Sequence, residues 1–198
     1  MTEALTLAEL AEIERAVGVR LPEDYRTFLT EVGNGGPVGG FELTRVVRDG
    51  DGWRWTGNDP ALIARLGTPF QPFDPAVREE HERARPVAGD FADAAAFEAA
   101  CRAWIQREDD LYDEEAYGTL VLAHQGCGHV WRLAVSGPHR GTVWDDARGS
   151  DVPLTPITGP DGEPLTFSEW HRRLGGGAPA APPAPSPPRP PRSPATAT

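Results

Sequence analysis

The sequence contains no lysine, so all 19 of its basic residues are arginine. This absence excludes Walker-type phosphate loops, Schiff-base enzymes and Ser-Lys hydrolases, because each of these sites needs a lysine amine. Cysteine is also scarce: Cys101 and Cys127 are too few for a disulfide framework, and we expect both to be reduced, buried thiols. No apolar run is long enough to cross a membrane, and the start lacks a signal peptide's cationic segment. These absences predict a cytoplasmic protein without a membrane segment.

Negative charge dominates the chain, with 30 acidic against 19 basic residues and a net charge of −11. A negative surface repels the phosphate backbone of nucleic acids and attracts cationic partners. We therefore predict that the chain does not bind nucleic acid and that its charge steers it toward cationic partners.

The composition changes at Gly175, where a Gly/Pro-rich segment without large apolar side chains begins. Such a segment cannot offset the entropy of ordering, so we predict a folded part over residues 1–174 and a disordered or polyproline II tail over 175–198. Arg189 and Arg192 are the tail's only charges, which leaves 17 − 30 = −13 for the folded part. The tail's Pro-Pro-Arg-Pro-Pro-Arg stretch could alternatively be a ligand for a groove that reads polyproline helices.

Two helices are predicted near the start of the chain. Thr6 and Glu9 form a capping box, and apolar residues recur at three- and four-residue steps from Leu7 to Val17. A second helix is predicted from Pro22, which suits the first helical position, to Val32. The following glycines favour a sharp turn into a strand over residues 38–44.

Strands dominate the rest of the predicted fold. We expect a strand at Trp53 and Trp55, a β-hairpin over residues 118–137 that turns at 125–128, and a third strand over 141–145. Helices are predicted over 60–66, over 91–106 and, after the capping box of Thr166 and Glu169, up to Leu174. On the helix over 91–106, Phe97, Cys101, Trp104 and Ile105 are expected to share one face. An antiparallel meander without a crossover helix indicates the α+β class.

Several of these elements resemble the SUKH superfamily, or Smi/Knr type, whose eukaryotic branch includes a yeast cell-wall-synthesis regulator. The resemblance rests on Leu21, Pro22, Tyr25, Phe28, Asn34, Gly35, Gly36, Gly141, Trp144, Phe167 and Trp170. It is less clear from Val46 to Tyr117. It implies that these residues are structural parts of one SUKH-like domain over residues 1–174. It also implies a non-catalytic binding function, because bacterial members are mostly immunity proteins against polymorphic toxins, often nucleases, and eukaryotic members are regulatory scaffolds.

The acidic run after the predicted helix over 91–106 is the candidate partner-binding site. It comprises Asp109, Asp110, Leu111, Tyr112, Asp113, Glu114 and Glu115. Its five carboxylates beside two apolar anchors would fit the cationic substrate groove of a nuclease toxin and mimic phosphate. The alternative is a solvated loop. Trp53 and Trp55 are a second candidate patch, although alternate positions on a strand are more typical of a core face.

Other constellations point more weakly to chemistry. His124, Cys127 and His129, with Cys101, could supply zinc ligands, but their spacing matches no zinc motif. Cys127 with a histidine lacks an oxyanion-forming helix, and the adjacent acids Asp145 and Asp146 are more typical of a solvated strand end than of acid–base catalysis. We therefore predict no metal, no cofactor and no enzymatic activity. An immunity protein that binds a cognate toxin domain is the leading interpretation, a regulatory scaffold that uses the tail is the second, and an enzyme or metalloprotein is the third.

Overall fold

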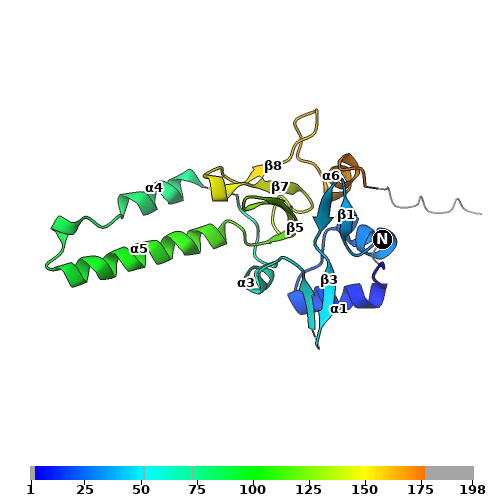
Figure 1. The fold of residues 1–198 in the computed structure, drawn as a ribbon, viewed down its shortest axis with the longest axis horizontal. Helices are drawn as coiled ribbons and strands as arrows, with labels where there is room; N and C mark the ends of the chain where they lie inside the picture. Colours follow the sequence, from blue (N-terminus) through cyan, green and yellow to red (C-terminus); the bar gives the residue numbers. More distant parts are fainter. Residues whose placement is uncertain (1–2, 51, 73, 177–198) are drawn as a thin grey trace, which may run out of the picture.

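The structure is a computed structural model that describes residues 3–50, 52–72 and 74–176 (Figure 1). The predicted tail lies outside the described residues apart from Gly175 and Gly176. Both predicted N-terminal helices are present. Helix α1 (Leu7–Val17) begins at the capping box of Thr6 and Glu9 and ends at Gly18, whose φ is 70°. Helix α2 (Glu23–Thr27) continues into the π-helical turn η1 (Phe28–Val32).

The strands confirm the α+β class and form a mainly antiparallel sheet. The six-stranded sheet has the order β1-β2-β5-β6-β7-β8, with bounds β1 (Gly36–Val38), β2 (Phe41–Leu43), β5 (Thr119–Gly126), β6 (His129–Ala134), β7 (Val143–Asp146) and β8 (Thr155–Pro156). The hairpin of β5 and β6 and the third strand β7 are as predicted. The single strand expected over residues 38–44 is instead two strands, because Gly39 and Gly40 reverse the chain at φ values of 54° and 85°. The two Trp residues lie on a separate ribbon of β3 (Val46–Asp49) and β4 (Gly52–Trp55).

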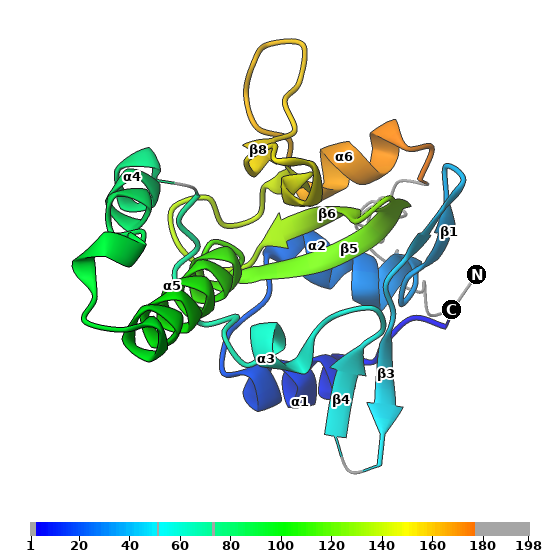
Figure 2. The same cartoon turned by 60° about the vertical axis from the view of Figure 1, so that its left-hand side comes forward.

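The remaining helices are α3 (Pro60–Ile63), α4 (Pro75–Arg83), η2 (Ala88–Asp90), α5 (Ala94–Glu114), η3 (Arg148–Ser150) and α6 (Phe167–Arg173). Helices α4 and α5 project away from the sheet as a long hairpin (Figure 1). We call residues 74–117 the arm and the rest of the described chain the body. In Figure 2, which turns the view by 60°, the arm lies to one side of β5 and β6, and β3 and β4 extend below the sheet.

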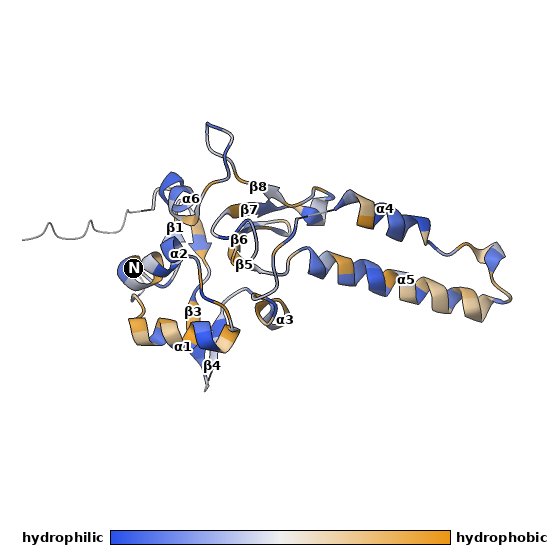
Figure 3. Cartoon of the chain, turned by 180° about the vertical axis from the view of Figure 1, so that it is seen from behind, coloured by the Kyte–Doolittle hydropathy of each residue, from blue (hydrophilic) through white to orange (hydrophobic). Residues whose placement is uncertain are grey.

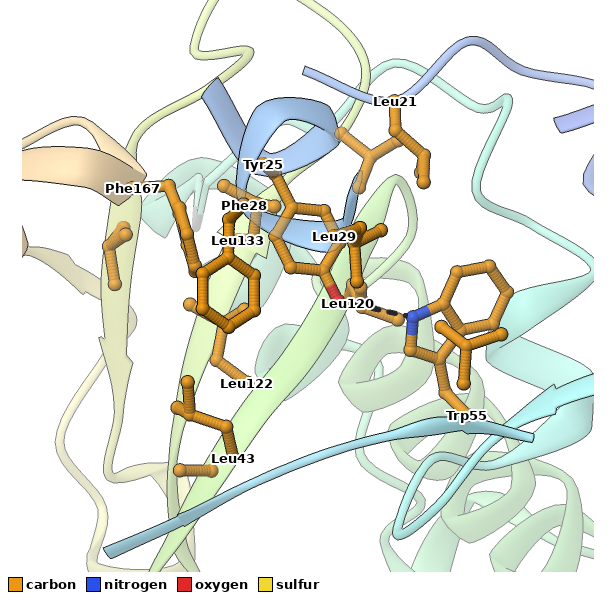
Figure 4. Close-up of a cluster of buried hydrophobic side chains, with 14 of the residues drawn as sticks. Leu21, Tyr25, Phe28, Leu29, Leu43, Trp55, Leu120, Leu122, Leu133 and Phe167 are labelled. Carbon is orange, nitrogen blue, oxygen red and sulfur yellow. Dashed lines mark hydrogen bonds between the residues drawn. The ribbon is translucent and has the colours of Figure 1, made fainter. Parts of the chain in front are cut away.

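The main hydrophobic core lies between the sheet and the helices α1, α2, η1 and α6. Figure 4 shows its centre, where Tyr25, Phe28 and Phe167 pack over the leucines of β5 and β6. The Trp55 indole N–H donates a 3.3 Å hydrogen bond to the Tyr25 hydroxyl, and burial raises the pKa of Tyr25. A smaller cluster of Phe70, Ala134, Trp144 and Leu154 lies apart from it. Trp144 therefore belongs to the smaller cluster, whereas its neighbour Val143 belongs to the main core, as alternation along a strand requires.

The turn before β1 shows why the residues of the resemblance occupy their positions. The Asn34 side chain pairs with both backbone groups of Val46, accepting from its N–H at 2.8 Å and donating to its carbonyl. Gly35 has a φ of +81°, and a Cβ there would lie 2.4 Å from the Thr44 carbonyl oxygen. Only glycine fits this position without a backbone shift. The turn thereby joins η1 to the start of β3.

Candidate functional site

The acidic run, expected beyond the end of a helix over 91–106, lies instead on the last turns of α5, so the alternative of a solvated loop is wrong. The helix was predicted to end at Gln106 but extends to Glu114. No glycine or proline interrupts the chain between Ala94 and Tyr117, and Leu111, which is 5% exposed, extends the buried side of the helix. The sequence thus contains no residue that would end the helix, and the burial of Leu111 in the folded protein stabilises its last turns.

The less exposed side of α5 carries residues spaced by alternating steps of four and three: Phe97, Cys101, Trp104, Glu108, Leu111 and Glu115. Trp104, Glu108 and Glu115 contact α4 through His81 and Arg78. The Trp104 ring stacks on the His81 imidazole with centroids 4.5 Å apart, and its indole N–H donates to the His81 carbonyl at 3.0 Å. Ile105 does not belong to this side, since it is 54% exposed. Of the four residues predicted to share one face, Phe97, Cys101 and Trp104 are thus half-buried, and Ile105 is exposed.

A network of alternating charges fastens the arm to the sheet. The Arg132 Nε lies 2.6 Å from Asp146 Oδ2, and the Arg148 Nε lies 2.8 Å from Asp146 Oδ1. Arg148 also lies 3.3 Å from Glu115 and 4.0 Å above the Tyr112 ring. Glu115 in turn accepts from Arg78 at 2.9 Å. Of the predicted binding residues, Tyr112 and Glu115 thus take part in the contacts that hold the arm in place, and Leu111 is buried at the same end of α5.

Asp146 contradicts the solvated strand end expected for Asp145 and Asp146. It is 3% exposed, whereas Asp145 is partly exposed and accepts a hydrogen bond from Gln125 at 2.6 Å. Burial alone would raise the pKa of Asp146, but hydrogen bonds from Arg148 and the charge of Arg132 outweigh it and lower the pKa to about 2. The carboxylate therefore stays ionised as the centre of the network. No local signal in the sequence marks this carboxylate, because Arg132 meets it only when β6 pairs with β7.

The other acidic residues of the run divide into two pairs. Asp110 accepts from Gln106 at 3.0 Å, and Glu114 lies 2.6 Å from Arg107. Among the residues that the structure describes, Asp109 and Asp113 have no ion-pair partner. They lie on one exposed face with Ile105 and Tyr112, because these residues are three or four positions apart on α5. We call Ile105, Asp109, Tyr112 and Asp113 the acidic flank.

The acidic flank is electrostatically unfavourable for the helix that carries it. The carboxyl end of a helix dipole disfavours negative charge, and like charges four residues apart repel each other. The last turn of α5 holds no basic residue, and Asp109 and Asp113 are separated by four positions. Residues that are unfavourable for the local structure, such as these negative charges at the end of a helix, are expected at functional sites. The flank is therefore the strongest candidate for a binding surface on the arm.

Charge is concentrated on the arm as a whole. Residues 74–117 contain 13 acidic and five basic residues, hence 5 − 13 = −8 of the chain's −11. Figure 3 shows that the hydrophilic residues of α5 gather toward its end nearest the sheet, while the tip is paler. A cavity of about 270 Å³ adjoins the flank. Tyr112, Val152 and Pro153 form its apolar lining, and its charged lining has both signs: Arg78, Arg148, Glu108, Glu115 and Asp151. Val152 is 45% exposed, so an apolar anchor stands beside the negative charge.

The residues considered for metal binding or catalysis are dispersed. His124 contacts the Gly57 carbonyl oxygen at 3.2 Å, and His129 contacts the Ser150 hydroxyl at 2.8 Å. Within the described part of the chain, no group of three or more His, Cys, Asp or Glu residues is arranged to hold a metal. The expectation of buried thiols is wrong: Cys101 is half-buried on the arm, and Cys127 is exposed in the β5–β6 turn.

The second candidate patch is mainly part of the core. Trp55 is 1% exposed, and the partly exposed Trp53 packs against the same cluster. The Arg48 guanidinium lies 4.5 Å above the Trp53 ring, and the Trp53 N–H donates to Glu12 at 3.3 Å. The core-face interpretation is therefore the better one for these two residues.

Comparisons with known proteins identify a family. The model of the SMI1/KNR4 family (SUKH-1) matches residues 4–152, which include the arm and all strands except β8. Neither the curated proteins nor the solved structures contain a match. Phe167 and Trp170 lie beyond the matched range, although both are buried in the main core. None of the helices that the structure describes is long and apolar enough to span a membrane.

Proposed function

We propose that this chain, which belongs to the SMI1/KNR4 family (SUKH-1), is an immunity protein that neutralises a toxin domain by binding it in the cytoplasm. The family is known for immunity and binding roles and is generally non-catalytic. The observation that carries the proposal is the acidic flank on a projecting arm. The flank lies near the root of the arm, and its side chains are exposed, so a partner can contact them without any rearrangement of the body.

A cationic groove is the partner surface that fits the flank best. Nucleases bind phosphates through cationic grooves, and carboxylates at helical spacing would occupy the same positions. Tyr112 and Ile105 supply apolar contact beside Asp109 and Asp113, and aromatic anchors of this kind often carry much of an interface's binding energy. Charge complementarity also raises the association rate. We therefore expect a partner with a basic active-site groove.

Co-expression tests this function directly. The C-terminal region of the neighbouring large open reading frame is expressed alone and together with the full chain, and surviving colonies are counted. Survival restored by the full chain would support the immunity function. A region that is harmless alone, or that kills with the chain present, would contradict this pairing.

A regulatory scaffold is the second candidate function, and the tail's composition favours it. Residues 177–198 contain nine prolines and no large apolar side chain, a composition read by proline-binding grooves. In this case, capture of a partner from the same cells would depend on the tail. Capture by the full chain that survives substitution of the tail prolines by glycine would argue against the scaffold.

A further inference from the structure

A second surface, far from the acidic flank in the sequence, is an uncharged groove beside the edge strand β1. Its volume is about 270 Å³, and its apolar walls come from Phe28 and Val32 on η1 and from Val38 and Leu43 on the first two strands. The glycine backbone of residues 33–39 forms much of the rest. The His171 imidazole completes the lining. We call this cavity the β1 groove.

The chain leaves α6 along the rim of this groove. Gly175 has a φ of +88°, and the Gly176 N–H donates to the His171 carbonyl at 2.9 Å. The Gly176 backbone lies against the His171 ring, since a Cβ at this position would be 2.3 Å from the imidazole Cε1. Both glycines are themselves lining residues of the groove. The described chain therefore ends at the mouth of an apolar groove that it helps to form.

We propose that the β1 groove binds the chain's own residues 178–185, whose prolines pack on Phe28, Val32, Val38 and His171. The groove and the segment that occupies it belong to the same chain. Residues 177–198 supply 22 residues beyond Gly176, and a polyproline II segment advances ~3.1 Å per residue, so these eight residues could span the groove.

The chemistry of the two partners matches. Residues 177–188 carry no charge, and the tail's first charge is at Arg189. Among the described residues that line the groove there is no Asp, Glu or Arg, and burial lowers the pKa of His171, which favours its neutral form. Proline-rich segments dock into apolar, aromatic-lined grooves because little conformational entropy is lost. Prolines cannot donate hydrogen bonds to the edge of β1, so groove packing is favoured over an added strand.

The test uses the full-length chain and two matched variants in the tail. The proximal variant replaces Pro179, Pro182, Pro183 and Pro185 by glycine, and the distal variant makes the same change at Pro187, Pro188, Pro190 and Pro191. Both variants leave every described residue unchanged, so the body is expected to fold normally. The readouts are the Val32 and Val38 methyl resonances, the His171 imidazole resonances and their nuclear Overhauser contacts with proline protons.

The proposal predicts proline contacts at the groove in the native chain and in the distal variant, and their loss in the proximal variant. The methyl and imidazole resonances should shift only in the proximal variant. Native spectra without such contacts, and unchanged in both variants, would overturn the proposal. Contacts that vanish on dilution would also overturn it, because a second copy would then be the occupant.

Discussion

The body combines helices with strands and the arm is entirely helical, and the two bury their residues very differently. In α1, Leu10 and Ile13 are at most 1% exposed, and the body's helices cover one face of the sheet. In the 21 residues of α5, only Leu111 is fully buried, and neither core cluster includes a residue of the arm. The body is thus held by apolar packing, whereas the arm is held at its root by Leu111 and a charge network. This difference leaves most of the arm's surface available to a partner.

The largest expected effect comes from removing the centre of the charge network. Asp146→Asn would leave Arg132, which is 7% exposed, without its buried counter-ion. Loss of one partner of a buried ion pair costs about 3–5 kcal/mol of unfolding free energy. Denaturant unfolding measures this cost, and Asp145→Asn, at a partly exposed site, is the control with an expected cost below about 1 kcal/mol. Equal effects of the two substitutions would mean that the network does not hold the arm's root.

A smaller loss is expected when the arm's own apolar anchor is shortened. Leu111→Ala removes buried apolar volume at the root and should cost about 2–4 kcal/mol. Ile105→Ala is the control, because Ile105 lies on the exposed side of the same helix and is 54% exposed. It should change the unfolding free energy by less than about 0.5 kcal/mol. Thermal or denaturant unfolding of both variants compares the two sides of α5. A similar cost for both would refute the assignment of Leu111 as the anchor.

Acid should weaken the network in a defined pH range. The pKa of Asp146 falls from 3.8 to about 2 on folding, so its contribution is complete above pH 4 and is lost as the pH falls toward 2. The difference corresponds to about 2 kcal/mol of unfolding free energy. Urea unfolding at pH 5 and at pH 2.5 should therefore show a smaller acid-induced loss in Asp146→Asn than in the native chain. An identical loss in both proteins would show that other carboxylates dominate acid unfolding.

The smallest expected effect is a gain in stability. Asp113→Asn removes a negative charge from the carboxyl end of α5 and should raise the unfolding free energy by about 0.3–1 kcal/mol. Glu98→Gln, on the same helix but far from that end, is the control. Its ion pair with the exposed Arg102 is 3.9 Å long, so the substitution should lower the unfolding free energy by less than about 0.5 kcal/mol. Denaturant unfolding measures the unfolding free energy of both variants. A loss of stability in Asp113→Asn would contradict the view that the flank is kept at a cost to the fold.

Local signals predicted the body well. The capping boxes at Thr6 and Thr166 and the β5–β6 turn depend on residues close together in the sequence, and all three are present. The charge network could not be predicted in this way, because Arg78, Glu115 and Arg148 meet only when the arm folds against the sheet. The length of α5 was predictable in part. The three- and four-residue spacing from Phe97 to Leu111 continues past Gln106, and this spacing alone predicts a longer helix.

We expect the acidic flank, rather than the arm's negative charge in general, to bind the partner. The most direct measurement is the association rate with the toxin domain as a function of salt. Asp109→Asn with Asp113→Asn is compared with Asp110→Asn with Glu114→Gln, which removes the same charge from the intrahelically paired positions.

The flank variant is expected to associate more slowly than both the native chain and the paired-site variant, and to show a flatter salt dependence. Equal rates for the two variants, or a native rate for the flank variant, would contradict the claim.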